Sequence, residues 1–372
     1  MSALLRSHLK RTLAFIVVSV FCLSAIVATA QVSAKKPATV SNSTNSNPQI
    51  GEDGGDKTAP KEKTLTSTPT SESWTTLRLP ADSNPGPPAL ALQGTFPEFT
   101  RDFLEMEWRK DDEVDLYVIK PVGVEKPPVI LYLYSFPSDK NRFVNNNFAK
   151  IATKNGFAAV GFVSALTGQR YRNRPMKEWF VSELQEALGK SVHDVQYVLD
   201  YLQKRGDLDM TRVGMYADGS GASIAIMAAA VDPRIKTLDL IDPWGDWPDW
   251  LAKSTLVPED ERRNYVTPEF LKKVQPLDPV TWLPKLATQR VRLQFLGDDT
   301  VTPDAAMQKL RAAAGPNVTI STYTTSEDFI ASVGGTSGQR IFDWIKQQLA
   351  PSGSEQKLAA DRENDLRRRE KK

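Results

Sequence analysis

The sequence predicts an α/β fold for residues 96–350, in which a mostly parallel sheet is flanked by helices. One observation is a set of short apolar runs, which suit parallel strands buried on both faces. The second is that stretches with apolar residues at helical spacing separate these runs, as the crossover helices of a doubly wound sheet would. The predicted strands are 128–134, 157–163, 212–216, 291–296 and 319–323, and the predicted helices are 144–155, 181–205, 220–231, 303–314 and 337–349.

The region before the first parallel strand predicts an antiparallel hairpin at one edge of the sheet. Residues 99–120 alternate apolar and polar side chains, as strands with one solvated face do. Residues 107–113 (Glu-Trp-Arg-Lys-Asp-Asp-Glu) supply a polar turn in the middle of this stretch.

A small cap is predicted at about residues 242–290, after the strand that follows the third predicted helix. This stretch interrupts the alternation of strands and helices, is rich in proline and contains Trp244, Trp247, Trp250 and Trp282. Insertions of this kind often lie over the strand ends as lids. The three-residue spacing of the tryptophans is equally typical of plain core packing, so both interpretations stay open.

The first 30 residues have the pattern of a secretory signal peptide. Arg6, Lys10 and Arg11 precede an apolar stretch at residues 13–30, which ends in Ala-Thr-Ala, the small-x-small pattern of signal-peptidase cleavage. Cleavage is expected after Ala30, and the mature protein would then be secreted or periplasmic. The apolar stretch also reaches the lower length for spanning a bilayer, about 18 residues, so an uncleaved membrane anchor is the alternative.

Two flanking segments are predicted to lie outside the folded domain. Residues 31–95 are rich in Ser, Thr, Pro, Asn, Lys and Gly, a composition that buries too little apolar surface to fold, so a disordered spacer is expected. Residues 351–372 mix basic and acidic side chains, which predicts a solvated tail, with a binding tail as the alternative. The single cysteine, Cys22, lies in the signal, so the exported domain would have no disulfide and no thiol nucleophile.

The charge balance argues against nucleic acid as a partner. The chain has 47 Lys and Arg against 45 Asp and Glu, and loss of the signal removes three basic residues. The exported domain is then close to neutral, without the excess of positive charge that nucleic-acid binding requires. Contact with a membrane is expected only if the N-terminal segment is retained as an anchor.

The most informative motif lies at residues 212–222 (Arg-Val-Gly-Met-Tyr-Ala-Asp-Gly-Ser-Gly-Ala). It resembles the nucleophile elbow of the α/β-hydrolase superfamily, as found in dienelactone hydrolases, acyl esterases and prolyl-oligopeptidase-like peptidases. The residues two before and two after the tip of this elbow must be small, because the strand and helix backbones approach closely there. Ala217 and Gly221 meet this demand when the tip is Gly219, so the resemblance implies an elbow without a nucleophile serine.

Ser220 and Asp218 are the alternative tips of the elbow, and both violate the same demand. A tip at Ser220 places Asp218 in a position that requires a small residue, and a tip at Asp218 places Tyr216 there. Ser220 is therefore expected to begin the following helix. Its hydroxyl would cap that helix or lie near a small anion at the helix N-terminus.

The resemblance extends to the two loops that supply the acid and the histidine of the family. Residues 297–303 (Gly-Asp-Asp-Thr-Val-Thr-Pro) resemble the acid loop and place Asp299 on the acid. Asp328 stands where the family has its histidine, after the last strand. The chain has two histidines. His8 lies in the signal, and His193 lies on the helix before the elbow strand, where a surface or hydrogen-bonded core histidine is expected rather than a catalytic one.

The oxyanion hole of the family is also altered in this sequence. The first long strand of the family commonly ends in His-Gly, and Tyr134 and Ser135 stand there in this chain. Together with Asp218 and Gly219 they are the predicted pocket residues. Backbone amides can still point into this pocket, so a site for an anion or a carbonyl group is expected to survive. The sequence has no metal-ligand spacing and no P-loop lysine, and we predict no metal and no cofactor.

These features predict an exported α/β-hydrolase-fold protein that lacks the nucleophile serine and the catalytic histidine. It would bind a ligand, either a small molecule or a peptide, or a partner protein. The alternative is an active ester or peptide hydrolase in which Asp299 or Asp328 assists Ser220 as a carboxylate base. A third interpretation is an interaction module whose function lies in the spacer and the tail.

Overall fold

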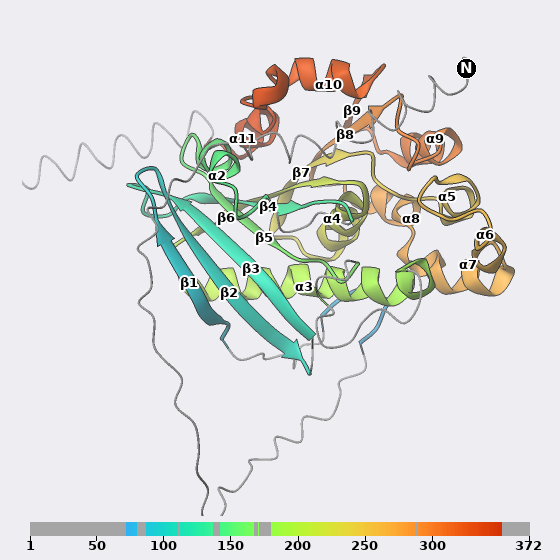
Figure 1. Ribbon diagram of the computed structural model, residues 1–372, viewed down its shortest axis with the longest axis horizontal. Coiled ribbons are helices and arrows are strands. Elements are labelled where there is room, and N and C mark those ends of the chain that lie inside the picture. Colours follow the sequence, from blue (N-terminus) through green and yellow to red (C-terminus); the bar gives the residue numbers. More distant parts are fainter. Residues whose placement is uncertain are drawn as a thin grey trace, which may run out of the picture.

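The structure is a computed structural model that describes residues 72–79, 87–110, 112–136, 142–166, 170, 180–287 and 289–351. The described residues form one sheet with helices on both faces (Figure 1). The predicted signal peptide, much of the predicted spacer and nearly all of the predicted tail lie outside these ranges. Within them, no helix is both long and apolar enough to cross a membrane.

The sheet contains the strands β1 (Ala89–Thr95), β2 (Phe99–Arg109), β3 (Asp112–Pro121), β4 (Pro128–Leu133), β5 (Ala158–Phe162), β6 (Asp209–Asp218), β7 (Ile235–Ile241), β8 (Arg290–Leu296) and β9 (Val318–Tyr323). Their spatial order is β1-β2-β3-β5-β4-β6-β7-β8-β9. All pairings among β4 to β9 are parallel, whereas β1, β2 and β3 pair antiparallel, as does β3 with β5. The mostly parallel sheet predicted from the apolar runs is confirmed.

The helices that cover this sheet also follow the predicted order. They are α2 (Asn146–Thr153), α3 (Leu184–Arg205), α4 (Gly219–Val231), α5 (Trp247–Lys253), α6 (Arg262–Tyr265), α7 (Pro268–Val274), α8 (Pro279–Trp282), α9 (Asp304–Ala313), α10 (Ser326–Ser332) and α11 (Asp343–Leu349). The last predicted helix is shorter than expected. A glycine with a positive φ, Gly338 at +57°, follows a short 3-10 helix, and α11 begins only after it.

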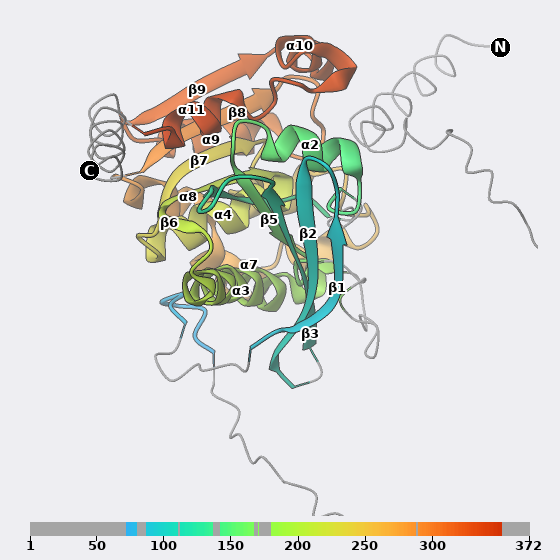
Figure 2. The same cartoon turned by 90° about the vertical axis from the view of Figure 1, so that its left-hand side faces the viewer.

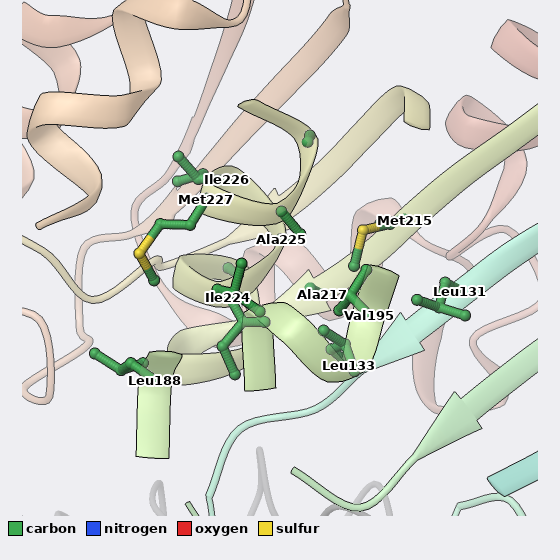
Figure 3. Packing of buried hydrophobic residues seen from close by; sticks show 14 of the residues in the cluster. Leu131, Leu133, Leu188, Val195, Met215, Ala217, Ile224, Ala225, Ile226 and Met227 are labelled. Carbon is green, nitrogen blue, oxygen red and sulfur yellow. The ribbon is translucent and has the colours of Figure 1, made fainter. Parts of the chain in front are cut away.

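Two hydrophobic clusters hold the helices to the two faces of the sheet. Successive side chains of a strand point to opposite faces, so Leu131 and Leu133 belong to one cluster while Ile130 and Tyr132 belong to the other. The first cluster contains the apolar faces of α3 and α4 (Figure 3), and the second contains those of α2 and α11. In Figure 2, α3 accordingly lies on one side of the sheet and α2 and α11 on the other.

The predicted hairpin at the sheet edge is formed by β2 and β3, with its turn inside the polar residues 107–113. It is not the outermost pair, because β1 adds a further antiparallel strand beside β2. The folded domain therefore begins earlier than the predicted boundary at residue 96, and this corrects the end of the predicted spacer. Residues 72–79 also pack on the domain. Leu77 is fully buried, and the ring of Trp74 covers Gly189, where a Cβ would lie 2.7 Å from ring atom Cζ3.

The predicted cap forms α5 to α8, which pack against α3, α4 and α9. Its tryptophans are part of the domain core, as the core-packing interpretation proposed: Trp244, Trp247 and Trp250 are fully buried in the same cluster as α3 and α4. This segment also contacts the turn between β6 and α4, because the amide of Trp244 donates to the carbonyl of Gly219 at 3.3 Å.

Candidate functional site

The turn between β6 and α4 has the geometry that the elbow motif predicts. Gly219 follows the last residue of the strand, begins the helix and has a φ of +48°, which disfavours residues with a side chain. A Cβ on Gly221 would lie 2.7 Å from the carbonyl carbon of Leu133, so this position tolerates only glycine. Ala217 is fully buried. The small residues thus surround a tip at Gly219, the register argued from the sequence.

The space above Gly219, where a nucleophile would project, is filled by two other residues. A Cβ on Gly219 would lie 2.9 Å from Cβ of Ser135 and 3.0 Å from Nε1 of Trp244. Real Cβ atoms do not approach other heavy atoms so closely without displacing them. A side chain at this position therefore requires Ser135 to move.

The backbone amides that would form an oxyanion hole already have partners within the chain. In this fold the hole uses the amide after the elbow tip and an amide from the loop after the first long strand. Here the amide of Ser220 donates to Oγ of Ser135 at 3.3 Å, and the amide of Phe136 donates to Oγ of Ser220 at 3.1 Å. The amide of Ser135 donates to a carboxylate oxygen of Asp218. The side chains of Ser135, Ser220 and Asp218 thus bind the amides that a substrate oxyanion would need.

Tyr134, the other predicted pocket residue, turns away from this turn. Its ring belongs to the cluster on the opposite face of the sheet from α4, where it lies 5.8 Å from the ring of Phe143 and 4.0 Å from the guanidinium carbon of Arg142. The alternation of side chains along the chain explains this: Leu133 packs on the α4 side, so Tyr134 points to the other side. Of the two residues that replace His-Gly, Ser135 is the one that hydrogen-bonds to Ser220 of the elbow.

Three carboxylates gather at the carboxyl ends of β6, β7 and β8, and we call Asp218, Asp242 and Asp299 the strand-end carboxylates. Burial raises the pKa of Asp242 well above its ordinary value, and the negative charge of Asp299 raises it further. Burial also raises the pKa of Asp299, although the amides of Thr302 and Val301 partly offset this by donating to its carboxylate at 2.9 and 3.0 Å. Burial likewise raises the pKa of Asp218. Asp242 was not among the predicted site residues. The signal that could have identified it is an aspartate directly after a buried strand, β7.

Asp328, which stands at the expected position of the histidine, is occupied in capping α10. Its carboxylate accepts from the amide of Thr325 at 3.1 Å, and the hydroxyl of Thr325 accepts from the amide of Asp328 at 3.1 Å. This reciprocal capping box satisfies two free amides at the start of the helix. The side chain is exposed. No described hydrogen bond joins it to Ser220 or Asp299, so the structure does not bring these three predicted catalytic residues together.

His193 lies in the core, as the sequence analysis expected, and its described contacts are with residues outside the elbow. Its ring is fully buried, with Nδ1 2.7 Å from a carboxylate oxygen of Glu72 and the ring of Trp74 at a centroid distance of 5.2 Å. The other histidine, His8, falls outside the described residues. Among the residues that are described, no group of three or more metal-ligating side chains could hold a metal ion.

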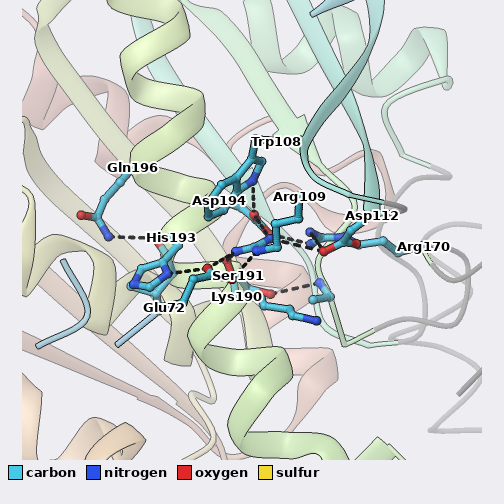
Figure 4. Close-up of polar contacts among 12 residues, drawn as sticks. Glu72, Trp108, Arg109, Asp112, Arg170, Lys190, Ser191, His193, Asp194 and Gln196 are labelled. Carbon is cyan, nitrogen blue, oxygen red and sulfur yellow. Dashed lines mark hydrogen bonds and ion pairs between the residues drawn. The ribbon is translucent and has the colours of Figure 1, made fainter. Parts of the chain in front are cut away.

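A second polar centre, which the sequence analysis missed, surrounds Arg170 (Figure 4). The guanidinium of Arg170 is fully buried and donates two hydrogen bonds to Asp112, at 2.8 and 3.0 Å, and one to Asp194 at 2.5 Å. Arg109 donates to Asp194 at 2.8 Å and holds Glu72 with two bonds at 2.6 and 2.7 Å. We call these five residues the arginine cluster. It ties the hairpin, α3 and residues 72–79 together.

Arginine neighbours determine the protonation of the carboxylates in this cluster. Burial raises the pKa of Asp194, but the charges and hydrogen bonds of Arg109 and Arg170 lower it more, so the pKa lies below its ordinary value. Burial raises the pKa of Glu72 as well, and the hydrogen bonds of His193 and Arg109 again lower it to a net value below the ordinary one. The cluster is therefore a set of satisfied ion pairs, in which the lowered pKa values of Asp194 and Glu72 make these two carboxylates weak bases.

Known proteins with a similar arrangement of strands and helices include esterases and a peptidase. No protein-family model matches the chain, and no curated protein sequence matches it. An acetyl xylan esterase from Paenibacillus sp. R4 has a TM-score of 0.54 at 13% identity, over 70% of this chain and 87% of that chain. Acetyl xylan esterase 1 from Thermoanaerobacterium sp. JW/SL YS485 has a TM-score of 0.52 at 13% identity, over 69% and 88% of the two chains.

The acylaminoacyl peptidase of Pyrococcus horikoshii has a TM-score of 0.51 at 13% identity, over 72% of this chain and 51% of that longer chain. Identities this low speak for the fold and not for the activity. Together with the strand order, these similarities establish that the chain has the α/β-hydrolase fold, as its elbow motif implied.

Proposed function

We propose that this protein is an exported, non-catalytic protein with the α/β-hydrolase fold that binds a ligand or a partner. The observation that carries the proposal is the packing at Gly219: Ser135 and Trp244 occupy the space of a nucleophile. The ligand class that fits the fold is a small molecule or a peptide, because the structurally similar proteins are esterases and a peptidase.

The chemistry of hydrolysis explains why this packing favours binding over catalysis. A serine hydroxyl becomes a nucleophile when a neighbouring base takes its proton, and the tetrahedral intermediate needs free amides that point at its oxyanion. The described contacts of the Ser220 hydroxyl are the amide of Phe136 and the hydroxyl of Ser135, neither of which is a base. The amides nearest to the elbow donate to Ser135, Ser220 and Asp218.

The proposed location is outside the cytoplasm, and it rests on the signal-like sequence of the first 30 residues. A secreted or periplasmic protein would start at Gln31 after cleavage. Contact with a membrane enters the proposal only if the apolar segment remains attached, and nucleic acid is not proposed as a partner because the net charge of the domain is close to zero. N-terminal sequencing of the protein recovered from its producing cells would report Gln31 if the signal is cleaved, and an intact N-terminus would contradict cleavage.

The experiment that tests the absence of a catalytic serine is labelling with a fluorophosphonate. This reagent modifies serine hydroxyls that a neighbouring base activates, with fluoride as the leaving group, and intact-mass spectrometry counts the attached groups. We expect the wild-type protein and Ser220→Ala to carry the same background label as each other and as the heat-denatured chain. Stoichiometric labelling of the wild type that disappears in Ser220→Ala would contradict the proposal and establish a hydrolase that uses Ser220.

A further inference from the structure

A cavity of about 770 Å³ lies at the end of the sheet opposite to the elbow. Its wall includes Pro128 at the start of β4, Phe157 immediately before β5 and Arg212 near the start of β6. The elbow follows the carboxyl end of β6, and β4, β5 and β6 run parallel to one another. The cavity is therefore separated from the elbow by the length of the strands, and its function is independent of the site proposed above.

One of the residues that line this cavity carries a buried amino group. Lys346 on α11 is only 5% exposed, and its Nζ donates to the carbonyls of Ile151 and Lys154 at 2.8 Å each. An ammonium group has three N–H bonds, so one remains for a further acceptor. Within the described ranges, no carboxylate lies within ion-pair distance of this nitrogen. Buried charges in proteins are ordinarily paired, whereas the two hydrogen bonds of this one go to backbone carbonyls.

The pKa of Lys346 reflects this incomplete pairing. Burial lowers its pKa to about 7, the nearby carboxylate of Asp343 raises it only in part, and the positive charge of Lys154 lowers it. An anion placed beside the nitrogen would stabilise the charged form, as opposite charges at short distance do. The protein alone thus compensates the positive charge of Lys346 only in part.

The rim of the cavity has the same sign of charge. Lys126 and Lys154 are exposed, and neither forms an ion pair with any residue that the structure describes. Arg212 also lines the cavity and pairs with Asp209 at 2.6 Å. Four basic side chains and one acidic side chain, Asp343, line the cavity in total, so an anion is favoured there over a cation.

We propose that this basic cavity binds a small organic anion, with a carboxylate or phosphate group at Lys346 and its apolar part against Phe157 and Pro128. The buried ammonium fixes the position of the anionic group, and the exposed lysines attract it from solution. The ring of Phe157 lies 5.7 Å from Nζ of Lys346, so both parts of one small ligand can be in contact at once. Ligand sites commonly combine an apolar wall with a few placed polar groups in this way.

The test is isothermal titration of the full chain with four probes: inorganic phosphate, phenyl phosphate, phenylacetate and neutral benzyl alcohol. We expect phenyl phosphate or phenylacetate to bind and benzyl alcohol to give no binding heat. Binding of phenyl phosphate and inorganic phosphate without phenylacetate identifies a phosphate site, and binding of both aromatic anions identifies a general site for organic anions. No binding of any anion to the wild type would overturn the proposal and leave Lys346 as a cap for the end of α2.

Variants of the rim locate the binding. Lys126→Gln/Lys154→Gln removes two exposed charges that make no described ion pair, so the fold is retained, and affinity is expected to fall about tenfold. The matched control Lys272→Gln/Lys273→Gln makes the same charge change on the exposed face of α7 and is expected to change affinity less than about twofold. Equal affinities of the rim variant and the wild type would show that the anion binds elsewhere and would overturn the assignment. Lys346→Gln, checked for folding by circular dichroism, is expected to abolish binding.

Discussion

The strand-end carboxylates and the arginine cluster both contain buried aspartates, but the pKa values of these aspartates are shifted in opposite directions. Asp242 and Asp194 are 7% and 1% exposed, yet the pKa of Asp242 lies well above its ordinary value and that of Asp194 lies below it. The difference comes from the neighbours. Asp242 faces Asp299 and Asp218, whereas Asp194 accepts hydrogen bonds from Arg109 and Arg170.

This contrast teaches that burial alone does not decide whether an acidic cluster stabilises a protein or strains it. In the arginine cluster every described charge has a partner of opposite sign at hydrogen-bond distance. At the strand ends the carboxylates depend mainly on backbone amides, such as the amide of Leu296, which donates to Asp242 at 3.0 Å. We therefore expect that replacing a carboxylate with a neutral amide stabilises the protein at the strand ends and destabilises it in the arginine cluster.

The largest effect is expected from Arg170→Met, which removes the central cation of the arginine cluster. Asp112 and Asp194 then remain buried without their main partner, and breaking a buried pair in this way costs about 3–5 kcal/mol. Urea denaturation of the variant beside the wild type measures the loss. Lys253→Met, which breaks the exposed pair with Asp249, is the control and should change stability by less than about 1 kcal/mol. A loss of less than about 1 kcal/mol in Arg170→Met would show that the cluster contributes little.

A smaller loss is expected from Gly219→Ser, which places a nucleophile-like side chain at the elbow. The positive φ and the collision with Ser135 together are expected to destabilise the fold by about 2 kcal/mol. Ser135→Gly in the same chain removes the collision and should restore about half of the loss. A denaturation cycle of the two single variants and the double variant measures this coupling. Strictly additive effects would mean that Ser135 does not fill the nucleophile position.

Asp242→Asn is expected to stabilise the protein by about 1 kcal/mol at pH 7. Because the folded-state pKa of Asp242 is raised, the folded protein binds more protons than the unfolded chain between about pH 4 and that pKa, so stability falls as the pH rises through this window. The asparagine oxygen can still accept from the amide of Leu296. Thermal unfolding at pH 7 and at pH 4 should show the gain only at pH 7. Asp194→Asn is the matched control and should destabilise the protein at pH 7. Stability changes of the same sign in both variants would contradict the proposed difference between the two regions.

The smallest effect is expected from Glu72→Gln, at about 0.5 kcal/mol, because Glu72 lies at the partly exposed end of the arginine cluster. Its pKa is lowered in the folded state, so its contribution is present above about pH 4.5 and is lost as the pH falls below that value. Chemical denaturation at pH 7 and at pH 3 should therefore show a difference from the wild type only at pH 7. A difference that persists unchanged at pH 3 would show that the carboxylate charge is not its source.

The apolar pattern of the sequence predicted most of the fold because most of its elements are buried. The parallel strands are short continuous apolar runs, and the long helices repeat apolar residues with a period of about 3.6. Small residues gave the register of the elbow. β1 was missed because its side chains face solvent: Leu90 and Leu92 are 55% and 67% exposed. Its pairing with β2 depends on backbone hydrogen bonds, which leave no sign in the apolar pattern.

The site was predicted in part, and the differences from the prediction have separate causes. Gly219, Ser220 and Ser135 lie together, because local rules fix a strand, a tight turn and a helix. The structure places two other predicted residues elsewhere. Tyr134 packs on the opposite face of the sheet because side chains alternate along the chain, and Asp328 caps α10. The arginine cluster joins residues far apart in the chain, Arg109, Arg170 and Asp194, and no local pattern reveals which charges will meet.

The central claim, that the elbow of this hydrolase fold is closed to catalysis, is tested most directly by hydrolysis of p-nitrophenyl acetate. The purified domain is assayed beside Ser220→Ala, and release of p-nitrophenolate is followed under identical conditions. We expect both proteins to react no faster than the buffer background, because Ser220 has no described base and the nearby amides are bonded within the chain. Turnover by the wild type that is lost in Ser220→Ala would contradict the account and make this protein an active hydrolase.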